Sequence, residues 1–137
     1  MPALPLTGHC QCGAAAYRVT AQPEAIYVCH CRECQRQSAS AFGISVSVAK
    51  AHFHLDWGEV GCWSRRTDSG RILHCHFCSV CGSRLWHEGP GWDVLSVKGG
   101  SLDVPPDLSD AIHIWTSRRL PGVVIPEAAT QFPEEPV

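Results

Sequence analysis

The sequence is poor in charged residues and has no excess of positive charge. Charged residues make up 18% of the 137 positions, and 11 basic against 13 acidic residues give a formal net charge of −2. A protein that binds nucleic acid usually presents a basic face to the phosphates. The composition therefore argues against a nucleic-acid partner.

Long apolar runs are missing as well. The longest uncharged stretch near the middle, residues 37–49, is too short and too rich in serine to cross a bilayer. The first ten residues lack the basic segment and apolar segment of a secretory signal. We therefore expect no membrane partner and a cytoplasmic location.

Cysteine, in contrast, is abundant. Nine cysteines occur, an odd number that a set of disulfides would not use completely. Tight pairs and triplets of cysteine in a cytoplasmic chain are typical of metal ligands. Seven of the nine are spaced in this way: Cys10 and Cys12, Cys29, Cys31 and Cys34, and Cys78 and Cys81.

The two pairs predict one closed zinc centre. Zinc in a structural site takes four ligands in a tetrahedron. The motif Cys78-x-x-Cys81 is followed by Gly82, which suits the unusual turn of a zinc knuckle. Cys10-x-Cys12 is the other pair, and Gly13 lets the chain turn so that both sulfurs can reach one metal ion. We expect this centre to stabilise the fold.

The triplet predicts a second, open centre. Three local thiolates leave the fourth place to an exchangeable ligand or to a distant residue. Cys75 is one candidate for that place, although a buried strand cysteine is the alternative, and Cys62 is also expected in the core. His30 lies between Cys29 and Cys31, so its side chain should point away from a metal ion that they share.

Short alternating segments separated by glycine and proline predict an all-β fold with one short helix. The expected helix covers residues 32–38. A single zinc-binding domain should span residues 1–120, and the proline-rich tail, 121–137, should hang loosely on the surface. The expected strands are 4–8, 14–20, 25–28, 41–48, 52–56, 60–65, 71–77, 85–87, 94–97 and 112–115.

The order of the cysteine motifs resembles the glutathione-dependent formaldehyde-activating enzyme family, which includes the centromere protein V domain. The resemblance covers about residues 8–119 and implies a β-tent fold with two zinc ions. It also implies that Cys10, Cys12, Cys78 and Cys81 hold the structural zinc, and that Cys29, Cys31 and Cys34 hold a zinc linked to carbon–sulfur chemistry. The matching segments are Gly8-x-Cys10-x-Cys12-Gly13, Cys29-His30-Cys31-x-x-Cys34, Trp57-Gly58-Glu59, Phe77-Cys78-x-x-Cys81-Gly82-Ser83, Gly100-Ser101-Leu102-Asp103, His113-Ile114-Trp115 and Ser117-Arg118-Arg119.

The open centre predicts thiol chemistry. Three thiolates give a zinc site a net charge of −1, which makes it a poor Lewis acid but leaves a good place for a soft thiol. We expect a zinc-dependent carbon–sulfur lyase that adds a small thiol such as glutathione to a small aldehyde, or catalyses the reverse reaction. Cys29, Cys31 and Cys34 would be its catalytic residues, with His30 or Glu33 as proton carriers.

Glutathione carries two carboxylates, and arginine is the side chain best suited to bind them. Arg36 is the preferred anchor because it follows the triplet directly. The other candidates are Arg32, Arg65, Arg66 and Arg118. Two other functions remain open: a non-catalytic zinc module that binds protein, and a thiol sensor of aldehydes or oxidants.

Overall fold

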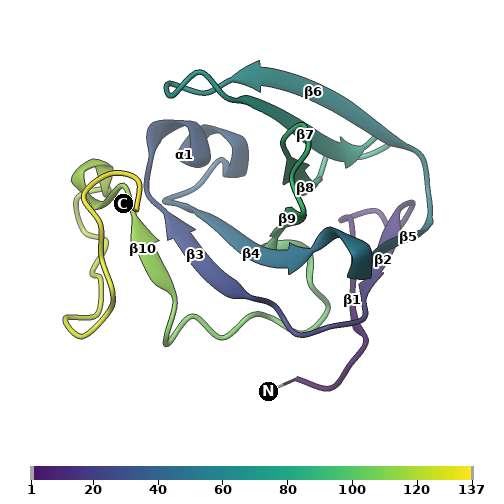
Figure 1. Ribbon diagram of the computed structural model, residues 1–137, viewed down its shortest axis with the longest axis horizontal. Coiled ribbons are helices and arrows are strands. Elements are labelled where there is room, and N and C mark those ends of the chain that lie inside the picture. The colour runs from purple at the N-terminus through teal and green to yellow at the C-terminus, as the bar shows by residue number, and fades with distance from the viewer. Residues whose placement is uncertain (1, 137) are drawn as a thin grey trace.

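The computed structural model describes residues 2–136, which form short strands and one α-helix (Figure 1). This confirms the predicted all-β fold with one short helix. No helix in the described residues is long and apolar enough to span a membrane. The elements are β1 (Leu6–His9), β2 (Ala16–Val19), β3 (Ala25–Cys29), α1 (Arg32–Ser38), β4 (Gly43–Ala49), β5 (Phe53–Trp57), β6 (Val60–Arg66), β7 (Ile72–Cys78), β8 (Arg84–Glu88), β9 (Val94–Lys98) and β10 (Ile112–Ile114), with 3-10 turns at Lys50–His52, Gly99–Ser101 and Thr116–Arg118.

The strands form two sheets. The smaller sheet has the order β1-β2-β5, and the larger has the order β10-β3-β4-β9-β8-β7-β6. Neighbouring strands are antiparallel except β10, which runs parallel to β3 at one edge of the large sheet. In Figure 1, α1 lies between the upper ends of β3 and β4 and the hairpin of β6 and β7. The segment that carries the cysteine triplet therefore faces that hairpin.

The core is built by buried side chains from both sheets. Burial of each large apolar side chain contributes about 1.5–3 kcal/mol. Tyr17 on β2 is fully buried, and its hydroxyl forms a 2.7 Å hydrogen bond with the Ser101 hydroxyl. Position 8 must be glycine, since a Cβ there would collide with that tyrosine ring. The core residues include Leu6, Val19, Val46, Val48, Leu85, Trp86, Leu95 and Val97.

The C-terminal segment, expected to hang loosely, makes backbone hydrogen bonds along β10. The His113 N–H donates to the Thr130 carbonyl at 2.9 Å, and the Phe132 N–H donates to the His113 carbonyl at 2.9 Å. Ile125 is buried. These contacts cover part of an edge strand, which otherwise presents unpaired backbone groups. The division of the chain at residue 120 stays a prediction.

The two isolated cysteines have different environments. Cys75 on β7 is fully buried, as expected of a core residue. The prediction that Cys62 lies in the core is wrong, because it is exposed on β6. This strand is the outer edge of the large sheet, and the neighbouring Trp63 is 52% exposed as well. An apolar residue in an alternating strand reaches the core only where another layer covers that face.

Candidate metal centres and adjoining cavities

Cys10, Cys12, Cys78 and Cys81 come together as predicted. Their sulfur atoms all lie within 4.8 Å of one another. The sulfurs of Cys10 and Cys12 are 3.6 Å apart, and those of Cys12 and Cys78 are 3.8 Å apart. In a tetrahedron with Zn–S bonds of about 2.3 Å, neighbouring sulfurs would be about 3.8 Å apart. This donor set therefore fits a tetrahedral metal ion.

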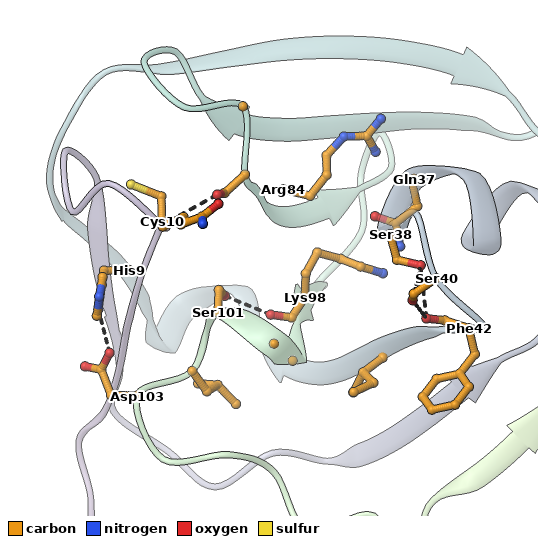
Figure 2. A pocket seen from close by; sticks show the side chains of 17 residues that line it. His9, Cys10, Gln37, Ser38, Ser40, Phe42, Arg84, Lys98, Ser101 and Asp103 are labelled. Atoms are coloured by element: carbon orange, nitrogen blue, oxygen red, sulfur yellow. Dashed lines mark hydrogen bonds and ion pairs between the residues drawn. The ribbon is translucent and has the colours of Figure 1, made fainter.

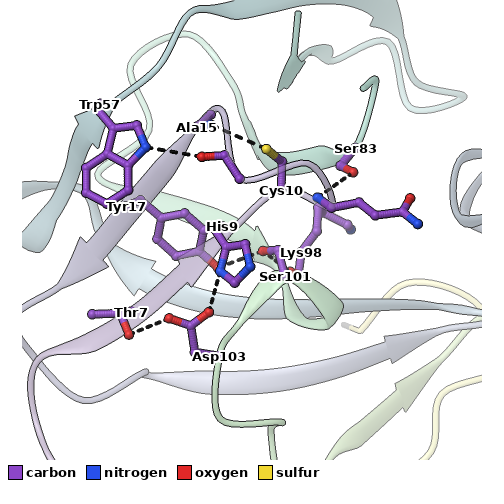
Figure 3. Close-up of polar contacts among 12 residues, drawn as sticks. Thr7, His9, Cys10, Ala15, Tyr17, Trp57, Ser83, Lys98, Ser101 and Asp103 are labelled. Atoms are coloured by element: carbon purple, nitrogen blue, oxygen red, sulfur yellow. Dashed lines mark hydrogen bonds and ion pairs between the residues drawn. The ribbon is translucent and has the colours of Figure 1, made fainter. Parts of the chain in front are cut away.

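The turn between β1 and β2 points backbone N–H groups at the first two sulfurs. The Ala15 N–H donates to the Cys10 sulfur at 3.3 Å, a contact drawn in Figure 3. The Ala14 N–H donates to the Cys12 sulfur at 3.4 Å. Burial raises the pKa of Cys10, but the hydrogen bond from Ala15 and contacts with the thiols of Cys78 and Cys12 lower it overall. Such donors favour the thiolate forms that a metal ion needs.

Ser83 connects the two halves of this centre. Its hydroxyl accepts a hydrogen bond from the Gln11 N–H at 3.1 Å (Figure 3) and lies 3.2 Å from the Cys81 sulfur. The hydrogen bond from Ser83 lowers the pKa of Cys81 to about 5. On the same knuckle, the Val80 N–H donates to the Cys78 sulfur at 3.3 Å. The centre thus ties the β1–β2 turn to the end of β7.

The triplet forms a second cluster where β3 ends and α1 begins. The sulfurs of Cys29, Cys31 and Cys34 lie within 4.8 Å of one another. Cys31 caps the helix, and its sulfur accepts a hydrogen bond from the Cys34 N–H at 3.3 Å. Hydrogen bonds from Cys29 and Cys34 lower the pKa of Cys31 to about 2, while the hydrogen bond to Cys31 raises that of Cys29. Three thiolates at this spacing would need a cation to offset their charge, and soft sulfur donors suit zinc.

Within residues 2–136, no fourth cysteine, histidine or carboxylate joins this cluster. Cys75 is not a member, and its thiol is directed at the Leu73 carbonyl, 4.0 Å away. The second cluster therefore has three protein donors, which leaves one tetrahedral position for another ligand.

Contacts with the C-terminal part of the domain hold the triplet loop. The buried His30 is not part of the sulfur cluster, and its Nε2 lies 2.9 Å from Nδ1 of His113 on β10. The buried Gln35 side chain donates to the His30 carbonyl at 2.8 Å and to the Arg118 carbonyl at 3.0 Å. The parallel pairing of β10 with β3 makes these contacts possible. They fix the loop whether or not its thiols bind a metal ion.

β4 approaches the triplet closely at Gly43. This residue pairs with Cys29 across the sheet. A Cβ at Gly43 would lie 2.9 Å from Nε2 of Gln37 and 3.4 Å from the sulfur of Cys34. Glycine therefore leaves space for the helix that carries the third cysteine.

Two cavities border this helix and share Gln37 and Arg84. One, of about 270 Å³, is bordered by Cys34, Trp63 and Arg65. The other, of about 720 Å³, is shown in Figure 2 and is bordered by Lys98, together with Ser38, Ser40, Phe42, Ser101 and Asp103. A ligand of the open centre has space to extend from Cys34 along the first cavity.

Lys98 is a residue of this site that the sequence did not reveal. It is only 7% exposed, and its ammonium donates to the Ser45 hydroxyl at 3.1 Å. Burial lowers the pKa of Lys98, whereas the thiols of Cys34 and Cys29 raise it. A lysine at the end of a strand is normally solvated, so its position in the sequence did not indicate that it would be buried.

Arg36, the anchor preferred from the sequence, lies on the exposed side of α1. Its guanidinium forms a 2.7 Å ion pair with Glu33. Arg36 borders the smaller cavity together with Arg65 and Arg84. Arg84 was not among the sequence candidates, and its guanidinium lies over the Trp63 ring at 5.7 Å. The role of Arg36 in binding stays a prediction.

Comparison with known families agrees with this geometry. The sequence model of the family described as glutathione-dependent formaldehyde-activating enzyme matches residues 5–118. The chain belongs to this family. The matched region contains all seven clustered cysteines. It ends at Arg118, whose carbonyl holds the triplet loop through Gln35.

A solved structure shares the fold of this family member. The crystal structure of a Rhodobacter sphaeroides protein aligns with a TM-score of 0.61 and 19% sequence identity. The alignment covers 78% of the present chain and 98% of the Rhodobacter chain. Among curated proteins, none matches the sequence significantly.

Proposed function

We propose that this protein is a zinc-dependent carbon–sulfur lyase that adds a small thiol, such as glutathione, to a small aldehyde, such as formaldehyde, or catalyses the reverse reaction. The observation that carries the proposal is the cluster of three cysteines with no fourth protein donor among residues 2–136. The family description, which names glutathione and formaldehyde, supports it.

Two zinc ions per chain follow from the two donor sets. Cys10, Cys12, Cys78 and Cys81 would hold one ion with a structural role, and Cys29, Cys31 and Cys34 would hold the other. A zinc ion in the three-cysteine site would favour the thiolate form of an incoming thiol. A cytoplasmic location would keep all nine cysteines reduced, in keeping with their free state.

The reaction needs a thiolate, a carbonyl group and one proton. The thiolate sulfur attacks the carbonyl carbon, a C–S bond forms as the C=O π bond breaks, and the oxygen takes up a proton to give an S-hydroxyalkyl product. The protein would contribute mainly by holding the two reactants together. Arg65, Arg84 and Arg36 border the cavity beside Cys34 and could bind the carboxylates of a peptide thiol.

Turnover can be measured directly by exchange NMR with labelled formaldehyde and glutathione. The uncatalysed addition supplies the background rate against which the catalysed rate is measured. We expect the rate to rise in proportion to protein concentration. Replacing Cys34 by serine should reduce the catalysed rate by more than about tenfold. Even changes to residues that only hydrogen-bond the metal ligands commonly reduce activity by that much.

Cys62→Ser is the matched control, because Cys62 is exposed on β6 and lies outside both clusters. It should leave the rate unchanged. A wild-type rate equal to the background at high protein concentration would rule out this reaction. A non-catalytic zinc module would then become the better description of the fold.

A further inference from the structure

Lys98 is a buried lysine with no carboxylate partner among residues 2–136. It ends β9 and lies opposite Ser45 of β4 in the sheet register. None of the ion pairs among the described residues includes Lys98, and the Ser45 hydroxyl is the one acceptor within hydrogen-bond distance of its ammonium. An ammonium group has three N–H donors. A buried charge is costly unless opposite charge lies nearby.

The nearby groups that can become negative are thiols. Ser45 lies two residues from Gly43 on β4 and so faces the same side of the sheet, where a Cβ at Gly43 would lie 3.4 Å from the Cys34 sulfur. The thiols of Cys34, Cys29 and Cys75 raise the pKa of Lys98. On β8, Arg84 adds positive charge, and the buried His87 lies within the electrostatic reach of Lys98. Because Cys75 is a neutral thiol in the core, the triplet is the main negatively charged group near this ammonium.

We propose that Lys98 is a positioning residue whose charge enables the three-cysteine site to accept a fourth, anionic sulfur ligand. This inference rests on the proposed function. Three thiolates and one Zn²⁺ carry a net charge of −1, and a thiolate in the fourth position makes it −2, its proton having passed to solvent. The negative charge of the site favours the protonated form of Lys98, whose positive charge offsets this increase.

Charged and neutral ligands should differ in how strongly their binding depends on Lys98. A neutral ligand such as imidazole leaves the net charge of the site unchanged, so its binding should depend little on Lys98. Binding of a thiolate adds one negative charge and should depend on Lys98 strongly. The distance from β9 across β4 to β3 is two strand spacings, about 10 Å. At that separation and an effective dielectric constant of about 20, one unit charge changes the affinity by about tenfold.

The experiment uses the full chain with cobalt in place of zinc, because the visible bands of cobalt report its ligands. 2-Mercaptoethanol, which carries no carboxylate, is titrated over a series of pH values. We expect Lys98→Met to weaken thiol binding by about tenfold near neutral pH and to move its pH midpoint up by about one unit. Imidazole binding should stay within about twofold, because no net charge is added.

Lys50→Met is the matched control, since Lys50 is an exposed lysine that pairs with Glu88. It should behave as the wild type. Lys98→Arg, which keeps the positive charge, should restore most of the thiol affinity. Lys98→Gln, also neutral, replaces the methionine variant should that protein fail to fold.

Equal thiol affinity and an unchanged pH midpoint in Lys98→Met would overturn the inference, and the proposed function would stand. Equal weakening of imidazole and thiol would also overturn it, because the lysine would then act only through the structure of the site. A wild-type protein that binds cobalt at the triplet but does not respond to thiol would refute the proposed function itself, and this inference with it.

Discussion

Replacing Cys10 by serine is expected to unfold the protein at ambient temperature, whereas replacing Cys34 should lower the melting temperature by only a few degrees. Cys10 is almost completely buried, and its centre joins the β1–β2 turn to β7. Structural zinc contributes an apparent binding free energy of about 10–16 kcal/mol, as much as the whole stability of a typical domain. Cys34 lies in α1, and the contacts of His30 and Gln35 hold this segment without a metal ion.

Circular dichroism during heating would measure both variants beside the wild type. Cys62→Ser is the control for cysteine loss, because Cys62 is exposed and lies outside both clusters. A Cys34→Ser protein that melts as early as Cys10→Ser would contradict the division into a structural and an open centre. An excess of chelator should reproduce the Cys10→Ser result in the wild type.

The second large effect concerns the number of sulfur ligands at the open centre. Addition of glutathione to the cobalt protein should strengthen the sulfur charge-transfer bands, since a fourth sulfur joins three. Cys31→Ser should remove most of this response, because Cys31 is one of the three sulfur donors and caps α1. Cys75→Ser should leave it intact, because the Cys75 sulfur lies outside the cluster. The measurement is a visible absorption titration at millimolar glutathione.

Cys75 also provides the result that would overturn this expectation. A response that appears only after Cys75 is replaced would mean that this thiol closes the site. A non-catalytic zinc module would then be favoured. Absence of any response in the wild type would argue against thiol binding.

Local sequence patterns predicted most of the secondary structure. The helix was expected at residues 32–38 and is found at Arg32–Ser38, where helix formers follow the capping residue Cys31. The hairpin of β6 and β7 was marked by turn residues at its tip. The cysteine spacing also indicated both clusters, because each pair or triplet is local and the number of ligands at zinc limits how they combine.

Contacts between distant segments could not be predicted from local sequence patterns. His30 and His113 are separated by 83 positions, and they meet only because β10 inserts parallel to β3. Lys98 lies opposite Ser45, two residues from the Gly43 that borders Cys34, because β9 follows β4 in the sheet order. The exposure of Cys62 depends on β6 being an edge strand. Each of these depends on sheet order, which alternation along a strand does not encode.

The most direct test of two centres, one closed and one open, is zinc analysis combined with X-ray absorption at the zinc edge on protein purified without chelator. We expect two zinc ions per chain, with an average of about three and a half sulfur neighbours, because one centre offers four cysteines and the other three. The remaining ligand should be a lighter atom, replaced by sulfur when thiol is added. Four sulfurs around every zinc before thiol is added would contradict the open centre, and a zinc content near zero with cysteines paired as disulfides would contradict both.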